Sequence, residues 1–412
     1  MPVTPPDPKG HLDALDGLRA VAILLVVSTH VAVLTGMGGL DGIGWRMTLN
    51  GGVGVPIFFI LSGALLYRPW ARSVITGRSA RPSVRTYFWH RGLRVLPAYW
   101  VMLPVGLLVF NAGKVPQGRW PSTWLEFLTL MQSVDPRPWW TGAGPRALGP
   151  IWSLSVEASF YLVLPLLAGL LDRYARRGAD RDARFRRLLS GIGLLGLSSL
   201  SSTIAVRYSE NIDVLSYNEH LLTRSFLYFA LGMGLVVVAE AAKADPRGAP
   251  ARWARTIGAS PGLGWVLAIC GLALVATPLA TPAFPGQPQT ANQYLVNILL
   301  FPLIAVALVS PALLRPEQPL TLAVLANPVM RRLGVVSYGM FLWHMIVIEA
   351  WYSVTDRALF QQDFWLVLVV ALVGAVTLAE LNHRLIELPS ARFRGRVAEK
   401  QPDRHQHQAL GQ

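Results

Sequence analysis

An arginine and a histidine share one face of an apolar segment near the start of the chain. Arg19 stands near the beginning of the run LDGLRAVAILLVVSTHVAVLTG, and His30 lies deep within it. A step of eleven residues places the two side chains within about 20° of each other around a helix and about 16 Å apart along its axis. An ionisable side chain costs about 2.5–3.5 kcal/mol or more at the centre of a bilayer and usually has a function there. His30 is therefore a candidate catalytic residue.

A second pair of cations precedes another apolar run. The segment RTYFWHRGLRVLPAYW places Arg91 and Arg94 three residues apart, which puts them on the same side of a helix. They could extend to the membrane surface and set the topology. They could also bind a phosphorylated ligand, because a guanidinium binds phosphate oxygens through a two-pronged fork. The residues alone leave both interpretations open.

A carboxylate lies in a third apolar block, GPIWSLSVEASFYLVLPLLAGLL. Ser153 and Glu157 are four residues apart and share a helix face near one end of the block. A carboxylate at such a depth must pair, take up a proton or line a wet cavity. His30 and the arginines are candidate partners, and a purely structural ion pair is the competing interpretation. In the run GVGVPIFFILSGALLYRPW, Ser62 and Gly63 favour close helix packing.

Further polar residues lie in the last two apolar runs. His344, in VVSYGMFLWHMIVIEAW, is expected to be a hydrogen-bonded core histidine that supports the site. The last run contains Glu380, His383 and Glu387. Glu387 and Pro389 are expected to end this run.

The composition indicates an all-α polytopic membrane protein. Of the residues, 52% are hydrophobic and 15% charged, and the apolar residues form long blocks. The net charge of +14 does not indicate nucleic-acid binding, because the basic residues lie between these blocks, as the positive-inside rule expects. Cys270 is the only cysteine, which excludes an intrachain disulfide and a cysteine-based metal cluster.

We predict about ten membrane-spanning helices with both termini in the cytoplasm, because most Lys and Arg residues then face inward. Asp13, Asp16 and Arg19 near the first span argue against a cleaved signal peptide. Residues 1–10 are expected to be a cytoplasmic segment, 11–390 the membrane domain and 391–412 a polar, disordered tail. The predicted spans are 17–36, 52–69, 95–111, 150–171, 188–206, 221–240, 262–281, 293–313, 333–352 and 364–386.

Six segments in order resemble the membrane-bound acyltransferase-3 family. They are LDGLRAVAILLVVSTH, GVPIFFILSGALLYRP, RGLRVLPAYW, GPIWSLSVEASFYLVLPLL, VSYGMFLWH and IELP. The resemblance implies that residues 11–390 are a ten-span domain that O-acylates sugars, polysaccharides or small secondary metabolites with acyl-CoA. It identifies Arg19 and His30 as the family's Arg-x10-His pair, Arg91 and Arg94 as its Arg-x-x-Arg pair, and Glu157 as the acid of the WSLSVE block. Pro56 stands where some members carry Asp, so that residue's role does not transfer.

The residues and the resemblance together predict an O-acyltransferase of the bacterial cytoplasmic membrane. His30 is expected to be the general base and Glu157 a second catalytic residue that orients it. The donor is expected to be acetyl-CoA or another short acyl-CoA, and the acceptor a hydroxyl of a glycan or a macrolide-like small molecule. No metal and no permanently bound cofactor are expected. The expected acyl-CoA ligands are Arg19, Arg91 and Arg94, with Asp16, Ser153 and His344 in support.

Two other functional classes fit the same residues. A proton-coupled transporter could use His30, Glu157 and His344 as a proton relay. A non-catalytic scaffold is the third possibility, which the presence of His30 and both arginine pairs disfavours.

Overall fold

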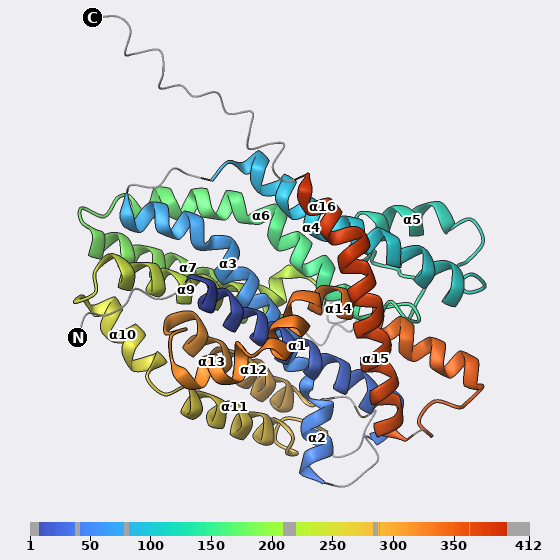
Figure 1. Ribbon diagram of the computed structural model, residues 1–412. Coiled ribbons are helices and arrows are strands. Elements are labelled where there is room, and N and C mark those ends of the chain that lie inside the picture. Colours follow the sequence, from blue (N-terminus) through green and yellow to red (C-terminus); the bar gives the residue numbers. More distant parts are fainter. Residues whose placement is uncertain are drawn as a thin grey trace, which may run out of the picture.

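The described part of the chain is a bundle of α-helices with no strand (Figure 1). Nine helices in this part are long and apolar enough to cross a membrane, and there are ten if a bent pair forms one span. The prediction of an all-α polytopic membrane protein is confirmed. The computed structural model describes residues 8–37, 42–77, 82–142, 144–208, 220–282, 287, 289–361 and 363–393.

The long helices correspond to the apolar blocks of the sequence. They are α1 (Pro8–Leu34), α3 (Gly54–Thr76), α4 (Val84–Pro104), α6 (Trp152–Ala175), α7 (Arg181–Tyr208), α9 (Leu222–Ala244), α12 (Ala291–Leu314), α14 (Pro328–Thr355) and α15 (Phe364–Asn382). The shorter helices are α2 (Ile43–Leu49), α5 (Trp120–Leu128), α10 (Ala249–Gly258), α11 (Pro261–Val275), α13 (Pro319–Leu325) and α16 (Leu388–Arg392). Single turns are η2 (Gly51–Val53), η3 (Val105–Val109), η4 (Gln132–Val134), η5 (Gly149–Ile151) and η6 (His383–Glu387).

Three predicted spans differ most from the observed helices. The predicted span 95–111 begins at Val84 instead, so Arg91 and Arg94, which were expected to precede it, lie inside α4. The predicted span 262–281 corresponds to α11, which ends at Val275 and passes as a span only together with the preceding α10, at a bend of 64°. The break precedes Pro261, which lacks the N–H that would continue the hydrogen-bond ladder. The first helix begins at Pro8 rather than at residue 17, and an ion pair of 3.0 Å between Asp13 and Arg331 holds its early part against α14.

The two ends of the chain were predicted to be cytoplasmic. Residues 1–7 and 394–412, which include most of the predicted disordered tail, lie outside the described residues. Residues 8–10 of the predicted N-terminal segment form the first turn of α1. The side of the membrane on which each terminus lies stays a prediction.

Helix α1 lies in the middle of the bundle (Figure 1) and contacts α3, α12, α14 and α15. Glycines allow close crossings between the central helices. A Cβ atom at Gly63 of α3 would overlap the Phe229 carbonyl of α9, and one at Gly232 of α9 would overlap the Ile60 carbonyl of α3. The predicted packing role of Gly63 is therefore confirmed, and α3 is held against α9 with its backbone in contact.

Candidate active site

A cavity inside the bundle is lined by residues of α1, α3, α4, α6 and α14. Helices far apart in sequence thus contribute to one site. Its wall contains hydroxyls from Ser62, Tyr161, Ser337 and Tyr338 beside the charged groups. The structure brings five predicted site residues together in this wall: Arg19, Arg91, Arg94, Ser153 and Glu157.

The carboxylate of Glu157 is held by two hydroxyl groups. The Ser62 hydroxyl of α3 donates to Glu157 Oε1, and the Tyr161 hydroxyl donates to the same oxygen at 2.6 Å. Ser62 was expected to serve packing alone, and this expectation is wrong because its hydroxyl binds the carboxylate. Sequence reasoning missed Tyr161, although its position four residues after Glu157 on one helix was a usable signal. Ser153, on the same face, donates to the Pro150 carbonyl at 3.0 Å.

The three arginines differ in their partners. Arg19 donates to Asp16 at 2.5 Å, and the supporting role of Asp16 stays a prediction. Within the described ranges, Arg91 and Arg94 form no hydrogen bond or ion pair. Arg19 also lies close enough to Arg94 for the two like charges to repel. A half-buried guanidinium without a direct counter-ion costs free energy, and the attraction of a bound anion would offset both this cost and the repulsion between the arginines.

The two predicted histidines form a pair outside this lining. The ring centres of His30 and His344 are 5.1 Å apart, with the planes at 55°. His30 Nδ1 lies 2.8 Å from the Val26 carbonyl, and His344 Nδ1 lies 2.8 Å from the Phe341 carbonyl. A carbonyl only accepts, so in each neutral ring Nδ1 carries the proton and Nε2 keeps its lone pair.

The neutral His30 ring can thus accept a proton at Nε2, but Glu157 does not orient this ring. The orienting contact of His30 comes from the Val26 carbonyl of its own helix, whereas Glu157 is bonded to Ser62 and Tyr161. His344 is completely buried, as expected of a core histidine. A relay joining His30, Glu157 and His344 has no direct hydrogen bond between the carboxylate and either ring among the described contacts.

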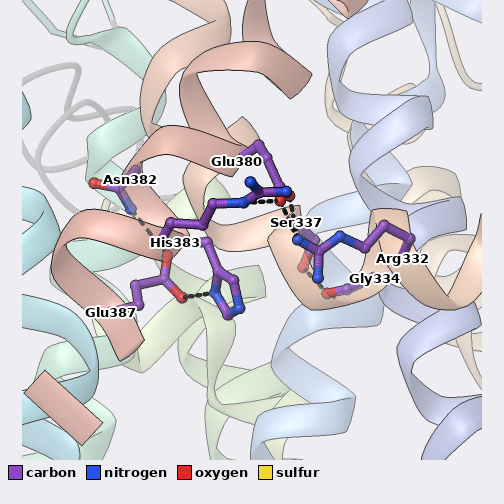
Figure 2. Close-up of polar contacts among 8 residues, drawn as sticks. Arg332, Gly334, Ser337, Glu380, Asn382, His383 and Glu387 are labelled. Carbon is purple, nitrogen blue, oxygen red and sulfur yellow. Dashed lines mark hydrogen bonds and ion pairs between the residues drawn. The ribbon is translucent and has the colours of Figure 1, made fainter. Parts of the chain in front are cut away.

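Another polar cluster lies where the end of α15 meets the start of α14 (Figure 2). Arg332 and Arg384 both pair with Glu380, the second at 2.6 Å. The Asn382 amide donates to Glu387 at 2.9 Å, and His383 lies 3.2 Å from the same carboxylate. Glu387 is the last residue of η6, but the prediction that Glu387 and Pro389 end the last span is wrong, because α16 continues the helical segment to Arg392. In the part of the chain that is described, no three His, Cys, Asp or Glu side chains gather as a metal site would require.

Comparisons with known proteins give a consistent result. The sequence model of the acyltransferase domain family matches residues 12–380. YrhL of Bacillus subtilis (strain 168) is 26% identical over 92% of this chain and 55% of its own length. Nodulation protein 10 of Rhizobium leguminosarum bv. viciae is 26% identical over 94% of this chain and 95% of its own length.

The peptidoglycan O-acetyltransferase OatA of Listeria monocytogenes is 24% identical over 92% of this chain. The chain spans about half the length of that protein, namely 56%. No solved structure gives a significant match.

Proposed function

Because the chain belongs to the acyltransferase-3 family, we propose that it is an integral-membrane O-acyltransferase that moves an acyl group from acyl-CoA to a hydroxyl. The observation that carries this proposal is the pair Arg91 and Arg94, which line the cavity and form no hydrogen bond or ion pair with any described residue. Two unpaired guanidiniums, with Arg19 beside them, suit the several phosphate groups of coenzyme A. Acetyl-CoA or another short acyl-CoA is the proposed donor.

The proposed chemistry uses His30 as the general base. Its Nε2 atom takes the proton of the acceptor hydroxyl as the hydroxyl oxygen attacks the thioester carbonyl carbon. A C–O bond forms, the C–S bond breaks, and the thiolate of coenzyme A leaves and takes the proton back from the imidazolium. An imidazole suits this exchange because it can take up a proton at one ring nitrogen and release it again. The His344 ring, whose centre lies 5.1 Å from that of His30, is proposed to support the base by packing against it.

Glu157 is the second proposed catalytic group, acting from within the cavity. Its carboxylate lies in the same wall as Arg19, Arg91 and Arg94, with which it shares an electrostatic environment. The hydroxyls of Ser62 and Tyr161 donate hydrogen bonds to the carboxylate. In the proposed reaction Glu157 positions the donor's polar arm between the arginines and the reacting centre.

The acceptor is proposed to be a hydroxyl of a glycan or a small secondary metabolite. One matched relative, the peptidoglycan O-acetyltransferase of Listeria monocytogenes, has a name that gives a glycan as its acceptor. The bacterial cytoplasmic membrane is the proposed location, in keeping with the many apolar helices.

The proposal is tested by acyl-CoA turnover of the purified protein in lipid nanodiscs. We expect acceptor-dependent release of coenzyme A by the wild type and a loss of about 10²–10⁴-fold in His30→Ala, the usual contribution of a positioned general base. His383→Ala is the matched control, because it removes a histidine from the cluster at the end of α15. Wild-type turnover in His30→Ala would exclude His30 as the base. Absence of acetyl-CoA binding by the wild type would refute the donor assignment.

A further inference from the structure

The bent pair α10 and α11 joins two helices of different character. Helix α11 is apolar along its whole length, and its side chains Leu263, Val266 and Leu267 are each more than half exposed. Exposed apolar side chains on such a helix face the hydrocarbon of a membrane. Helix α10 turns away from α11 by 64° at the break before Pro261 and lies at an edge of the bundle (Figure 1). It is therefore located where α11 enters the hydrocarbon.

One face of α10 packs against the protein. It contacts α9 and α12, and a Cβ atom at Gly258 would press against the side chain of Arg315. The ring centres of Trp253 and of Phe185, on α7, are 5.8 Å apart. The buried residues of this face are Pro250, Ala251, Ala254 and Gly258. They recur along the helix, so α10 is held on the bundle from its start to its end.

The two exposed flanks of α10 differ in chemistry. Trp253 and Ile257, one turn apart, are each 49% exposed. Arg252 and Arg255, three residues apart, are exposed on the other flank. At about 100° per residue, the centres of the two flanks lie about 150° apart around the helix. A helix of this kind lies in the plane of the membrane interface, with its apolar flank toward the hydrocarbon and its basic flank toward the headgroups.

The arginines of the basic flank pair with no carboxylate among the described residues. Arg252 donates to the Arg247 carbonyl at 3.3 Å, and Arg255 donates to the Pro246 carbonyl at 3.0 Å. Asp245, the nearest acid in the sequence, accepts from the backbone N–H of Arg247 at 3.1 Å instead. Each of the two bonds uses a single guanidinium nitrogen and leaves the positive charge in place. A phosphate bound at this flank would meet both the charges and the remaining donors.

We propose that α10 is an in-plane interfacial helix that binds the headgroups of anionic phospholipids. In this assignment Trp253 and Ile257 lie beside the upper part of the acyl chains, and Arg252 and Arg255 bind lipid phosphates. Each arginine at an anionic membrane surface is expected to raise the affinity for anionic lipid about fivefold. The assignment does not depend on the proposed acyl transfer, because α10 contributes no residue to the arginine-lined cavity.

The test measures lipid contact at α10 alone, in the full chain in nanodiscs. Cys270 is the only cysteine, so Cys270→Ser with Thr256→Cys allows a bimane fluorophore to be attached at an exposed position between the two flanks. The quenchers are phosphatidylglycerol and phosphatidylcholine, each with a nitroxide near the start of one acyl chain. We expect half-maximal quenching by phosphatidylglycerol at a mole fraction about tenfold lower than by phosphatidylcholine.

Two double variants of the labelled protein separate α10 from the net charge of the chain. Arg252→Gln, Arg255→Gln should bring the two mole fractions within about twofold of each other. The matched control, Arg332→Gln, Arg384→Gln, removes the same charge from arginines that pair with Glu380 and should keep the tenfold preference.

Three results would overturn the assignment. Equal quenching by the two lipids in the labelled protein would refute the preference for anionic headgroups. A preference that Arg252→Gln, Arg255→Gln leaves unchanged would show that this flank does not bind them. Absence of quenching by either lipid would refute the in-plane position of α10.

Discussion

Two groups of arginines near a glutamate have opposite arrangements in this protein. At the end of α15, Arg332 and Arg384 both pair with Glu380, and their side chains are 50% and 67% exposed (Figure 2). In the central cavity, Arg91 and Arg94 are half-buried and have no partner in the described part of the chain. The more buried arginines, Arg91 and Arg94, are thus the ones without a direct ion pair among the described residues.

The difference lies in what holds each carboxylate. Glu380 accepts from guanidiniums, whereas Glu157 accepts from the hydroxyls of Ser62 and Tyr161. Neutral donors satisfy Glu157 without occupying the nearby arginines. Exposed ion pairs contribute little to stability, and uncompensated charges in a cavity cost free energy until a ligand arrives. We therefore interpret the cavity group as a binding site and the group at the end of α15 as a structural contact.

The largest expected effect comes from removing both unpaired cations. The double variant Arg91→Gln, Arg94→Gln should lower kcat/KM for acetyl-CoA about 100-fold or more, mainly through KM, because each charge-assisted hydrogen bond contributes about 1.5–3 kcal/mol. Initial rates at varied donor concentration measure this.

The matched control removes the same charge from the other group. Arg332→Gln, Arg384→Gln should leave kcat/KM within about threefold of the wild type, since exposed pairs are worth about 0–1 kcal/mol. Equal losses in the two double variants would show that net charge, rather than the cavity, determines donor binding.

A smaller effect is expected when one donor to Glu157 is removed. Tyr161→Phe deletes the hydroxyl that lies 2.6 Å from the carboxylate and should lower the transfer rate about tenfold, because a hydrogen bond to a charged group is lost. Tyr87→Phe is the control, since the Tyr87 hydroxyl donates to a backbone carbonyl at 3.2 Å. If both variants slow transfer alike, the bond to Glu157 has no special role.

The smallest effect is expected at the end of α15. Glu380→Gln should change the free energy of unfolding by about 1 kcal/mol or less and leave acyl transfer unchanged. The change should shrink further at high salt, because exposed charges are screened. Thermal unfolding in nanodiscs at low and high ionic strength measures it, and a loss of activity there would contradict the structural interpretation.

Sequence patterns predicted the helices well because the signal is local. Each apolar block is long enough to span a bilayer, and a helix satisfies its own backbone hydrogen bonds. The clearest exceptions are the predicted span 95–111, which begins at Val84, and the predicted span 262–281, where the structure has only the shorter helix α11, bent by 64° against α10. Spacing along single helices also predicted that Ser153 shares a face with Glu157, and the same rule applied to Tyr161 would have found its bond.

The sequence contained no comparable local signal that would predict the contacts between different helices. Nothing in the spacing of α3 and α6 indicates that Ser62 donates to Glu157, or that His344 lies beside His30 rather than in the arginine-lined wall. The sequence also did not indicate the cavity that Arg224 of α9 and Asn297 of α12 line together, because these residues come from different helices and each is an isolated polar residue in its own segment.

The amino-acid sequence by itself therefore specified the membrane class, the helices and, by resemblance, the family. These depend on hydrophobic length and on motifs that are read along one segment. Only the tertiary structure decided which arginines remain unpaired and which hydroxyls hold Glu157. Those outcomes depend on how closely the helices cross, as at Gly63 and Gly232, where two backbones meet because neither residue has a Cβ atom.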